Sequence, residues 1–454
     1  MLLHHKLSEA ERNWIISFMI LPIMISSFFM QYYVHFIKSY VLYMLIMLVS
    51  AAVIGSVAMN RLRSSWKTLC SLWYVAIVCV MINIIRTEFD LNVYVDLVTF
   101  VCCAVMMACT GRNRLIYKKA VWIIVAFSVY FAASIWFQML FPEQYRRCFA
   151  NYLPERPMYV VLGLANEGAG YTGFSTNPGY TAGHLAAGIL MVFAYTLTRP
   201  IKSKGFLGGC ALLAFLLISM FMTGKRAPGV FILATLAAVL FVTLDKKQKM
   251  RTIKIAFKAG CIGILLLLIF RKPLSGIPFL ARLFDTLEGL LSGEDVSNNR
   301  AILYEFGMKL FRMNPLFGVG WCNFRRMGAG VITQFTELEA HNIYLQLLCE
   351  TGIVGAAVIL TPIVVFLYQT YRAVVETARS TQAGAAGWKM LLLFSFGYQL
   401  YFVVNGTMDN LLYDHNYVIM YFAALSMFMS YRRYQHKASF GQRNSYSPKR
   451  KKRL

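Results

Sequence analysis

Charged residues are scarce in this chain. Only 14% of its 454 residues are charged, whereas 58% are hydrophobic, and the mean hydropathy is +0.56. A soluble protein of this composition could not cover its surface with polar groups, so one large soluble core is excluded. Apolar runs close to the ~20 residues that cross a bilayer recur throughout the sequence. The composition therefore predicts an all-α polytopic membrane protein.

Paired cysteines and histidine clusters are also lacking. The sequence contains no CxxC pair and no His/Cys cluster, so we expect no metal and no cofactor. Most of the ten cysteines fall in apolar segments. Cys148 and Cys322 fall in loops, where they could form a disulfide, although nothing in their spacing requires one.

Nucleotide-binding motifs are incomplete. Gly224-Lys225 lacks the upstream glycine that a P-loop has at a fixed spacing. Gly168, Gly170 and Gly173 match G-x-G-x-x-G, but no βαβ unit surrounds them, which excludes a dinucleotide site. These three glycines are expected instead to let the backbone turn tightly and approach a ligand.

The apolar segments predict about twelve transmembrane helices, with a large extracytoplasmic helical loop between spans nine and ten. The segments lie near residues 14–31, 40–59, 69–85, 92–110, 120–140, 179–197, 206–222, 229–244, 254–270, 342–369, 389–404 and 416–431. The first is not expected to be a cleaved signal peptide, because its apolar run is long and no small-x-small site follows it.

The net charge of +25 is distributed unevenly. Lysine and arginine gather in the N-terminal segment, in the loops 61–67, 111–119 and 245–254, and in the C-terminal tail, whereas acidic residues gather in the other loops. This asymmetry follows the positive-inside rule and predicts a multi-pass protein of the cell membrane with both termini cytoplasmic. The charge therefore orients the protein, and we expect no nucleic-acid partner.

These assignments divide the chain into five parts. They are a cytoplasmic tail (1–13), spans one to nine with an outer loop at 141–178 (14–270), an extracytoplasmic loop (271–341), spans ten to twelve (342–431) and a basic cytoplasmic tail (432–454). The basic tail is expected to rest on anionic membrane lipids.

The long outer loop holds much of the polar sequence. The spacing of its apolar residues predicts amphipathic helices at 279–291 and 301–312. Pro315 ends the second helix, because proline has no backbone donor and restricts the residue before it. Gly318 and Gly320 then predict a tight turn.

Polar residues stand where this loop meets span ten. His341 and Asn342 precede the apolar run, so they combine a fixed helix end with access to water. Within the span, Gly352 and Gly355 are expected to allow close helix packing.

Other outer positions also carry candidate site residues. Lys225 and Arg226 lie in a short outer hairpin, where two adjacent cations suit either an anion site or ordinary interface contacts. Arg86 lies at the outer end of span three, where an arginine commonly snorkels to the interface. Asn177 precedes span six, and Asp409 lies in the last outer loop.

Several of these stretches resemble the O-antigen ligase and polymerase superfamily. Arg300 and Tyr304 match R-x-x-x-[YW], NPLFGVGWCNF carries P-x-x-G-x-G, and HNIYLQLLCETGIVG carries H-N-x-x-L with a later glycine. TGKRAPG is similar to that family's basic outer hairpin, and STNPGYTAG to its asparagine-containing approach to the middle span. The resemblance covers roughly residues 170–360. One departure is Tyr304, where tryptophan is common, which changes packing more than chemistry.

The resemblance implies about twelve helices and glycan transfer from a polyprenyl-pyrophosphate lipid on the outer face, without a metal. It implies that arginines hold the pyrophosphate and that the histidine acts at the acceptor. The catalytic candidates are therefore His341, Arg300 and Arg226. The substrate-binding candidates are Lys225, Asn342, Asn177, Arg86 and Asp409.

The chemistry of these residue types agrees with that assignment. A pyrophosphate leaving group gains negative charge in the transition state, which fixed guanidinium groups stabilise. An acceptor hydroxyl must lose a proton, and histidine titrates near neutral pH. Glu337, Glu339 or Asp409 could orient His341, and the sequence leaves that choice open. Glu350 lies roughly 180° around the helix from His341 and is a poor partner for it.

The sequence therefore predicts a glycosyltransferase that polymerises or ligates saccharides. Its donor would be an undecaprenyl-pyrophosphate-linked saccharide and its acceptor a glycan or lipid-glycan. We favour an O-antigen, capsule or exopolysaccharide polymerase, with a flippase or a chain-length regulator as further partners. The alternative is a lipid-linked oligosaccharide flippase or another polysaccharide transporter. Transporters usually place ionisable groups at the bilayer midplane, whereas these spans are nearly free of charge.

Overall fold

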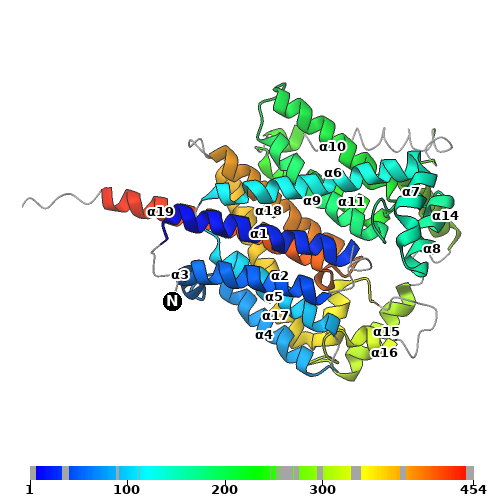
Figure 1. The fold of residues 1–454 in the computed structure, drawn as a ribbon, viewed down its shortest axis with the longest axis horizontal. Helices are drawn as coiled ribbons and strands as arrows, with labels where there is room; N and C mark the ends of the chain where they lie inside the picture. Colours follow the sequence, from blue (N-terminus) through cyan, green and yellow to red (C-terminus); the bar gives the residue numbers. More distant parts are fainter. Residues whose placement is uncertain are drawn as a thin grey trace, which may run out of the picture.

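The computed structural model describes residues 7–32, 40–87, 91–111, 113–245, 247–251, 254, 269, 276–293, 300–328, 339–378 and 385–445. The regular elements of these residues are all helices (Figure 1). They are α1 (Glu9–Tyr32), α2 (Tyr40–Val57), α3 (Met59–Ser65), α4 (Cys70–Ile85), α5 (Leu91–Cys109), η1 (Arg114–Tyr117), α6 (Lys118–Leu140), α7 (Pro142–Cys148), η2 (Ala150–Tyr152), α8 (Glu155–Asn166), α9 (Pro178–Leu197), α10 (Lys204–Met222), α11 (Arg226–Thr243), α14 (Pro278–Ser292), α15 (Arg300–Met313), α16 (Asn323–Gly328), α17 (Ile343–Ala378), α18 (Ala385–Asn405), η3 (Leu411–Tyr413) and α19 (His415–Ser445).

The predicted all-helical class is confirmed for the described residues. Each expected apolar segment coincides with a helix, except 254–270, which lies outside the described residues apart from two positions. Among the residues that the structure describes, five helices are long and apolar enough to cross a membrane by themselves: η1–α6, α9, α10, α11 and α17. A sixth is added if α2 and α3, which are bent by 90°, form one span. The protein is thus a multi-pass membrane protein, and the number twelve stays a prediction.

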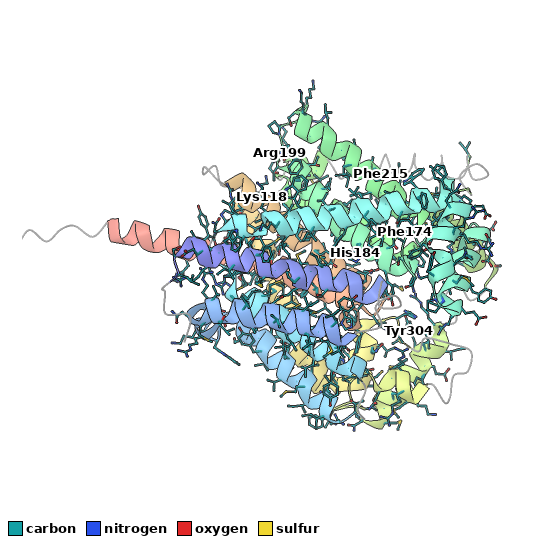
Figure 2. The ribbon with its side chains drawn as sticks, in the orientation of Figure 1. Lys118, Phe174, His184, Arg199, Phe215 and Tyr304 are labelled. Atoms are coloured by element: carbon teal, nitrogen blue, oxygen red, sulfur yellow. The ribbon has the colours of Figure 1, made fainter. Side chains whose placement is uncertain are left out.

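Five of the shorter helices, α7, α8, α14, α15 and α16, gather at one end of the bundle, whereas the short helix α3 lies toward the other end. In Figure 1, α7, α8 and α14 lie together at the right, with α15 and α16 below them. Figure 2 shows Phe174 and Tyr304 toward this end, whereas Lys118 and Arg199 lie toward the other, as does the C-terminal part of α19. The assignment of either end of the bundle to the cytoplasm stays a prediction from the charge pattern.

The outer segments form the helices that amphipathic spacing predicts. The expected helices 279–291 and 301–312 appear as α14 and α15, and α15 ends at Met313, just before the proline. In the loop 141–178 the sequence analysis predicted no helices, but α7 and α8 occur there. They pack through an aromatic cluster in which Tyr145 and Phe174 stack with ring centroids 5.8 Å apart.

Helix α9 is the most buried of the five candidate membrane spans, and small residues line it. It packs against α6, α10 and α18. A Cβ atom added at Gly183 would lie 2.7 Å from the Tyr417 ring, and one at Gly188 would lie 2.1 Å from the hydroxyl of Ser128. Small residues let helices approach closely, which favours their association within a membrane.

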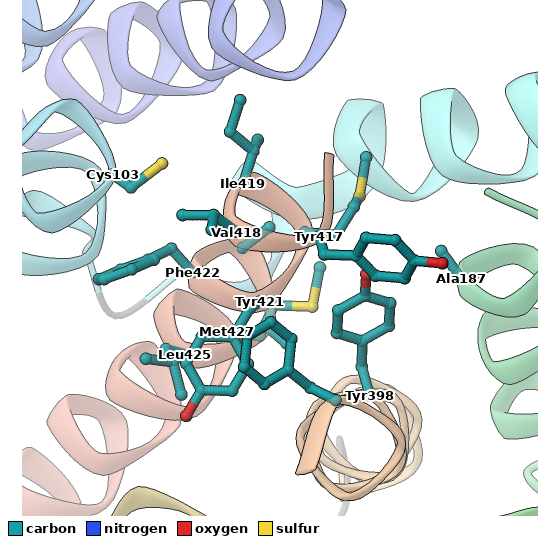
Figure 3. Packing of buried hydrophobic residues seen from close by; sticks show 14 of the residues in the cluster. Cys103, Ala187, Tyr398, Tyr417, Val418, Ile419, Tyr421, Phe422, Leu425 and Met427 are labelled. Atoms are coloured by element: carbon teal, nitrogen blue, oxygen red, sulfur yellow. The ribbon is translucent and has the colours of Figure 1, made fainter. Parts of the chain in front are cut away.

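Helix α19 is the second central element. Figure 3 shows its side chains spreading in several directions, toward Cys103 of α5, Ala187 of α9 and Tyr398 of α18. Its residues Tyr417 and Tyr421 are almost fully buried. The two central helices start at the end of the bundle that carries the short helices, so they fix the loops there.

Helix α17 is broken at Gly352, and a loop fills the break. Gly352 has φ 66° and ψ −175°, which interrupts the helical hydrogen bonds. Instead, the carbonyls of Cys349 and Glu350 accept hydrogen bonds from the backbone N–H groups of Val319 (2.9 Å) and Gly320 (2.8 Å). In return, Ile353 and Val354 donate to the carbonyls of residues 315 and 316, at 2.9 and 3.2 Å. The turn predicted at 318–320 is therefore docked into α17.

Gly318 and Gly352 must be glycines, because both have a positive φ and neither has room for a Cβ atom. Gly318 also has a positive φ, of 64°, and a Cβ there would lie 2.3 Å from the carbonyl carbon of Glu350. A Cβ at Gly352 would lie 2.3 Å from the carbonyl of Leu316. The prediction of close helix packing fits Gly355, which faces Cys79 of α4, but at Gly352 the close neighbour is a loop backbone.

Replacing Gly352 by alanine is expected to destabilise the protein. A backbone at φ 66° and ψ −175° is essentially confined to glycine and costs about 1–3 kcal/mol for a residue with a Cβ, and the overlap with Leu316 adds to that. Gly208→Ala is the matched control, since no atom lies within 4 Å of a Cβ there. Thermal unfolding in detergent, followed by tryptophan fluorescence, should show a lower midpoint for Gly352→Ala only. Equal midpoints for the two variants would contradict the docking described above.

Candidate active site at the end of the bundle

The hairpin 223–226 is fixed by glycines of two loops. Gly224 has φ 68°, and a Cβ there would lie 2.1 Å from the carbonyl of Ala169. A Cβ at Gly170 would lie 2.3 Å from the carbonyl of Thr223. The glycines of the loop 168–173 were expected to approach a ligand, but at Gly170 the close neighbour is this hairpin. The close packing of Gly170 against Gly224 fixes the backbone that carries Lys225 and Arg226.

Lys225 and Asn177 meet at the start of α9. The side chain of Asn177 caps this helix by accepting a hydrogen bond from the backbone N–H of Gly179 at 2.7 Å. The ammonium of Lys225 lies 3.8 Å from the position that a Cβ of Gly179 would occupy. The side chains of these two substrate-binding candidates therefore both lie close to Gly179.

His341 lies close to Asp409. Its Nδ1 atom is 3.7 Å from Oδ1 of Asp409, which is an ion-pair distance rather than a hydrogen bond, and both side chains are about one-third exposed. His341 has φ 47°, an uncommon backbone conformation for a residue other than glycine. Of the three acids left open by the sequence, Asp409 is thus in contact with the histidine, while Glu337 lies outside the described residues.

The third acid, Glu339, supports the loop from the other side. Its carboxylate accepts a hydrogen bond from the side-chain amide of Asn410 at 3.1 Å. Burial raises the pKa of Glu339, and this amide and the nearby imidazole of His341 act in the opposite direction. Glu339 therefore holds the loop that carries Asp409.

Charges around Asp409 favour its ionised form. Burial by itself raises the pKa of Asp409. The hydrogen bond and charge of the neighbouring His341 and the charge of Lys225 lower it by more than burial raises it, so the pKa of Asp409 lies below its usual range. Asp409 is therefore a carboxylate at neutral pH. A carboxylate in this position stabilises a protonated imidazole.

Asn342 ties the histidine loop to two other elements. Its side-chain oxygen caps α17 by accepting from the backbone N–H groups of Tyr344 (3.0 Å) and Leu345 (3.1 Å). Its own N–H donates to the side chain of Asn410 at 3.0 Å. Asn342 therefore positions His341 in the structure, and its predicted contact with substrate stays a prediction.

Arg300 reaches the same loop from α15. Its Nη1 atom donates to the carbonyl of Met408 at 2.9 Å, directly beside Asp409. A guanidinium carries five N–H donors, so this bond leaves donors for an oxyanion. The structure thus brings together His341, Asp409, Lys225 and Arg300 from four separate segments.

Arg226 and Arg86 lie at the edges of this group. Arg226 follows Lys225 in the chain, but its guanidinium donates to the hydroxyl of Thr286 on α14. Arg86 donates to the carbonyls of Phe317 (2.6 Å) and Gly318 (2.8 Å) and so holds the docked turn. The contacts described for Arg86 do not reach His341, and its proposed substrate contact stays a prediction.

A buried polar network under the site was missed by the sequence analysis. Glu350 is fully buried, and its carboxylate accepts hydrogen bonds from the backbone of Cys322 (2.8 Å) and Phe324 (3.2 Å) and from the hydroxyl of Tyr413 (2.7 Å). The side chain of Gln346 also donates to it, at 3.3 Å. These contacts agree with the prediction that Glu350 is a poor partner for His341. The position of Glu350 within an apolar run could have indicated this network, because a buried carboxylate needs hydrogen-bond donors around it.

Replacing Asp409 by asparagine is expected to lower turnover by at most about fivefold, since a partly exposed ion pair is worth up to about 1 kcal/mol. The stability that its ionised form contributes should be complete above the ordinary aspartate pKa of ~3.9 and should be lost as pH falls through the lower pKa in the fold. The melting temperatures of the variant and the wild type should therefore differ at pH 7, and the difference should begin to shrink as the pH falls below about 4. Glu376→Gln, on an exposed part of α17, is the control. A constant gap across this range would contradict the assignment.

These features define a multi-pass membrane protein whose histidine, acids and arginines gather in loops at one end of a helical bundle. Residues 210–360 match the family model described as O-antigen ligase. This match runs from α10 into α17, covers Arg226, Arg300 and His341, and supports the resemblance to the O-antigen ligase/polymerase superfamily that the motifs indicated. The family points to a glycosyltransferase-type ligase or polymerase activity. The comparison with curated proteins gave no match.

Proposed function

We propose that this protein transfers a glycan from an undecaprenyl-pyrophosphate carrier to a glycan acceptor on the outer face of the membrane. The observation that carries the proposal is the meeting of His341, Asp409, Lys225 and Arg300 in loops of distant sequence. The family match supports the class of reaction. The carrier, the acceptor and the side of the membrane belong to the proposal.

The cations of the site would bind the donor. In the reaction the bond between the anomeric carbon and the pyrophosphate oxygen breaks, and negative charge develops on that oxygen. Arg300 and Arg226 supply N–H donors already fixed by Met408 and Thr286, so they need little rearrangement when the charge develops. Lys225 adds a point charge nearby.

His341 would act on the acceptor. Its Nδ1 atom faces Asp409, so Nε2 is the atom that would take the proton from an acceptor hydroxyl. The hydroxyl oxygen then forms the new bond to the anomeric carbon, and undecaprenyl pyrophosphate leaves. Asp409, ionised at neutral pH, would stabilise the imidazolium that forms and would not itself take the proton.

The remaining assignments follow from charge and chemistry. Both termini and the basic loops would lie in the cytoplasm, and the site would lie outside, where lipid-linked saccharide is presented. A flippase would supply this donor, and a chain-length regulator would act on the product. We propose a polymerase of a surface polysaccharide rather than a ligase, and a mechanism that needs no metal.

Product analysis with the purified protein tests this function. Undecaprenyl-pyrophosphate-linked saccharide is incubated with the wild type, with and without EDTA, and both glycan length and free undecaprenyl pyrophosphate are measured. The proposal expects longer glycan and stoichiometric release of the carrier lipid in both samples. Movement of the donor across proteoliposomes without carrier release would favour the flippase alternative, and loss of product in EDTA would contradict the metal-free mechanism.

A further inference from the structure

Helix α14 is docked firmly against the hairpin that carries Arg226. It starts at Pro278, whose fixed φ suits the first helical position, and ends at Ser292, followed by the capping residue Gly293 with φ 75°. The ring of Phe279 packs on Phe221 of α10 with centroids 4.8 Å apart. A Cβ at Gly229 of α11 would lie 2.6 Å from that ring, so only a glycine leaves room for it.

The face of α14 that meets α11 carries an arginine. Phe279, Arg282 and Thr286 follow one another at spacings of three and four residues, which places them on one side of a helix. Phe279 contacts α10 and approaches α11, and Thr286 accepts a hydrogen bond from Arg226. The Thr286 hydroxyl donates to the carbonyl of Arg282 at 2.6 Å, so it can accept from Arg226. Arg282 therefore lies on the helix face between Phe279, which contacts α10 and α11, and Thr286, which contacts Arg226.

Arg282 is a half-buried cation beside a second cation. Among the residues that the structure describes, its guanidinium makes no hydrogen bond and has no carboxylate within 4 Å. Burial lowers the pKa of Arg282, and the charge of Arg226 lowers it further, while the exposed acids Glu167 and Asp285 oppose this more distantly. The positive charges of Arg282 and Arg226 therefore repel one another, and an anion bound between them would remove that repulsion.

A second side of α14, formed by exposed leucines, is suited to contact with the membrane surface. Leu287 and Leu291 lie one turn apart on a different side of the helix and are 50% and 89% exposed. A helix with an exposed apolar side and an opposite polar side lies in the interface, with its apolar side among the acyl chains. The side chains of Arg226 and Arg282 would then be at the depth of lipid phosphate groups.

We propose that Arg282 and Arg226 together bind the two phosphate groups of the donor, so that the site selects a lipid pyrophosphate over a lipid monophosphate. The inference rests on the proposed function and adds a residue that neither the motifs nor the family resemblance indicated. Two guanidinium groups from different helices offer separate forks, one for each phosphate. A monophosphate could engage only one of them fully.

Binding of two defined lipids tests the proposal. Undecaprenyl pyrophosphate and undecaprenyl monophosphate are titrated against the full-length protein in detergent micelles, and affinities are measured by thermophoresis. The wild type should prefer the pyrophosphate lipid. Arg282→Gln should weaken its binding about tenfold or more, and the monophosphate much less, so that the preference is lost. Arg282→Lys keeps the charge and should restore only part of it.

Two control variants separate a phosphate contact from a structural one. Arg312→Gln removes an exposed cation from the end of α15 and should leave both affinities unchanged. Glu167→Gln should also leave them unchanged, whereas an effect equal to that of Arg282→Gln would mean that Arg282 only balances this acid. Melting of each variant in the absence of lipid confirms that it is folded.

The outcomes distinguish this inference from the proposed function. If Arg226→Gln loses the pyrophosphate lipid while Arg282→Gln keeps the wild-type preference, the inference is wrong and the function stands. If the wild type binds the two lipids equally and neither arginine matters, the proposed function is contradicted, and the inference with it.

Discussion

Replacing His341 by glutamine is expected to lower turnover by roughly 10²- to 10⁴-fold, the usual range for loss of a general base. Glutamine keeps a hydrogen-bonding group but cannot take a proton from the acceptor. Donor binding should survive, because Arg300 and Lys225 are held by contacts that do not depend on the imidazole. The measurement is product formed per unit time by purified protein at saturating lipid-linked donor.

The unusual backbone of His341 calls for a second variant. At φ 47°, asparagine is tolerated better than glutamine, so His341→Asn keeps the local backbone while it also removes the base. Both variants should be inactive if proton transfer is the role of the side chain. Wild-type turnover in either variant would show that the histidine is structural. Loss of activity in the glutamine variant alone would point to strain in the backbone.

Replacing Arg300 by alanine is expected to abolish transfer while the protein still folds and inserts. Removing one fixed donor to a developing charge costs about 10²- to 10³-fold in rate, and donor affinity should fall as well. Arg226→Ala should behave in the same way. The lysine variants should recover little activity, because a point charge cannot form the two-pronged contact that a guanidinium makes with phosphate.

The control for both arginines is Arg312→Ala at the exposed end of α15, which removes the same charge away from the site. Turnover and donor affinity of all variants are compared at one protein level, after folding has been checked by melting in detergent. Near-normal polymer from Arg300→Ala or Arg226→Ala would remove that arginine from the site. If Arg312→Ala loses as much turnover and donor affinity as these variants, the effect would be due to the change in net charge.

Much of this architecture follows from local sequence. Apolar runs predict helices because a membrane requires backbone groups to be satisfied within each segment, and the amphipathic spacing of α14 and α15 is equally local. The motifs also pointed to Arg300 and His341. The structure brings these two together through the 405–414 loop, which the sequence could not foresee.

The features that the sequence missed depend on long-range contacts. The break at Gly352 is stabilised by hydrogen bonds to the turn at 315–320, more than thirty residues earlier, so helical periodicity runs through it unchanged. In the same way, the choice of Asp409 over Glu339 as the partner of His341 depends on how α18 ends. Arg282 carries no motif, and its position became visible only when α14 was docked on α11.

In the proposed mechanism the arginines and His341 have separate roles: the arginines bind the donor, and His341 takes the proton of the acceptor. It is tested most directly by measuring donor affinity and single-turnover rate on the same preparations of wild type, His341→Gln and Arg300→Ala. We expect His341→Gln to bind the donor with wild-type affinity and to react roughly 10²- to 10⁴-fold more slowly, and Arg300→Ala to bind the donor more weakly. Equal loss of donor affinity in both variants, or an unchanged rate in His341→Gln, would contradict it.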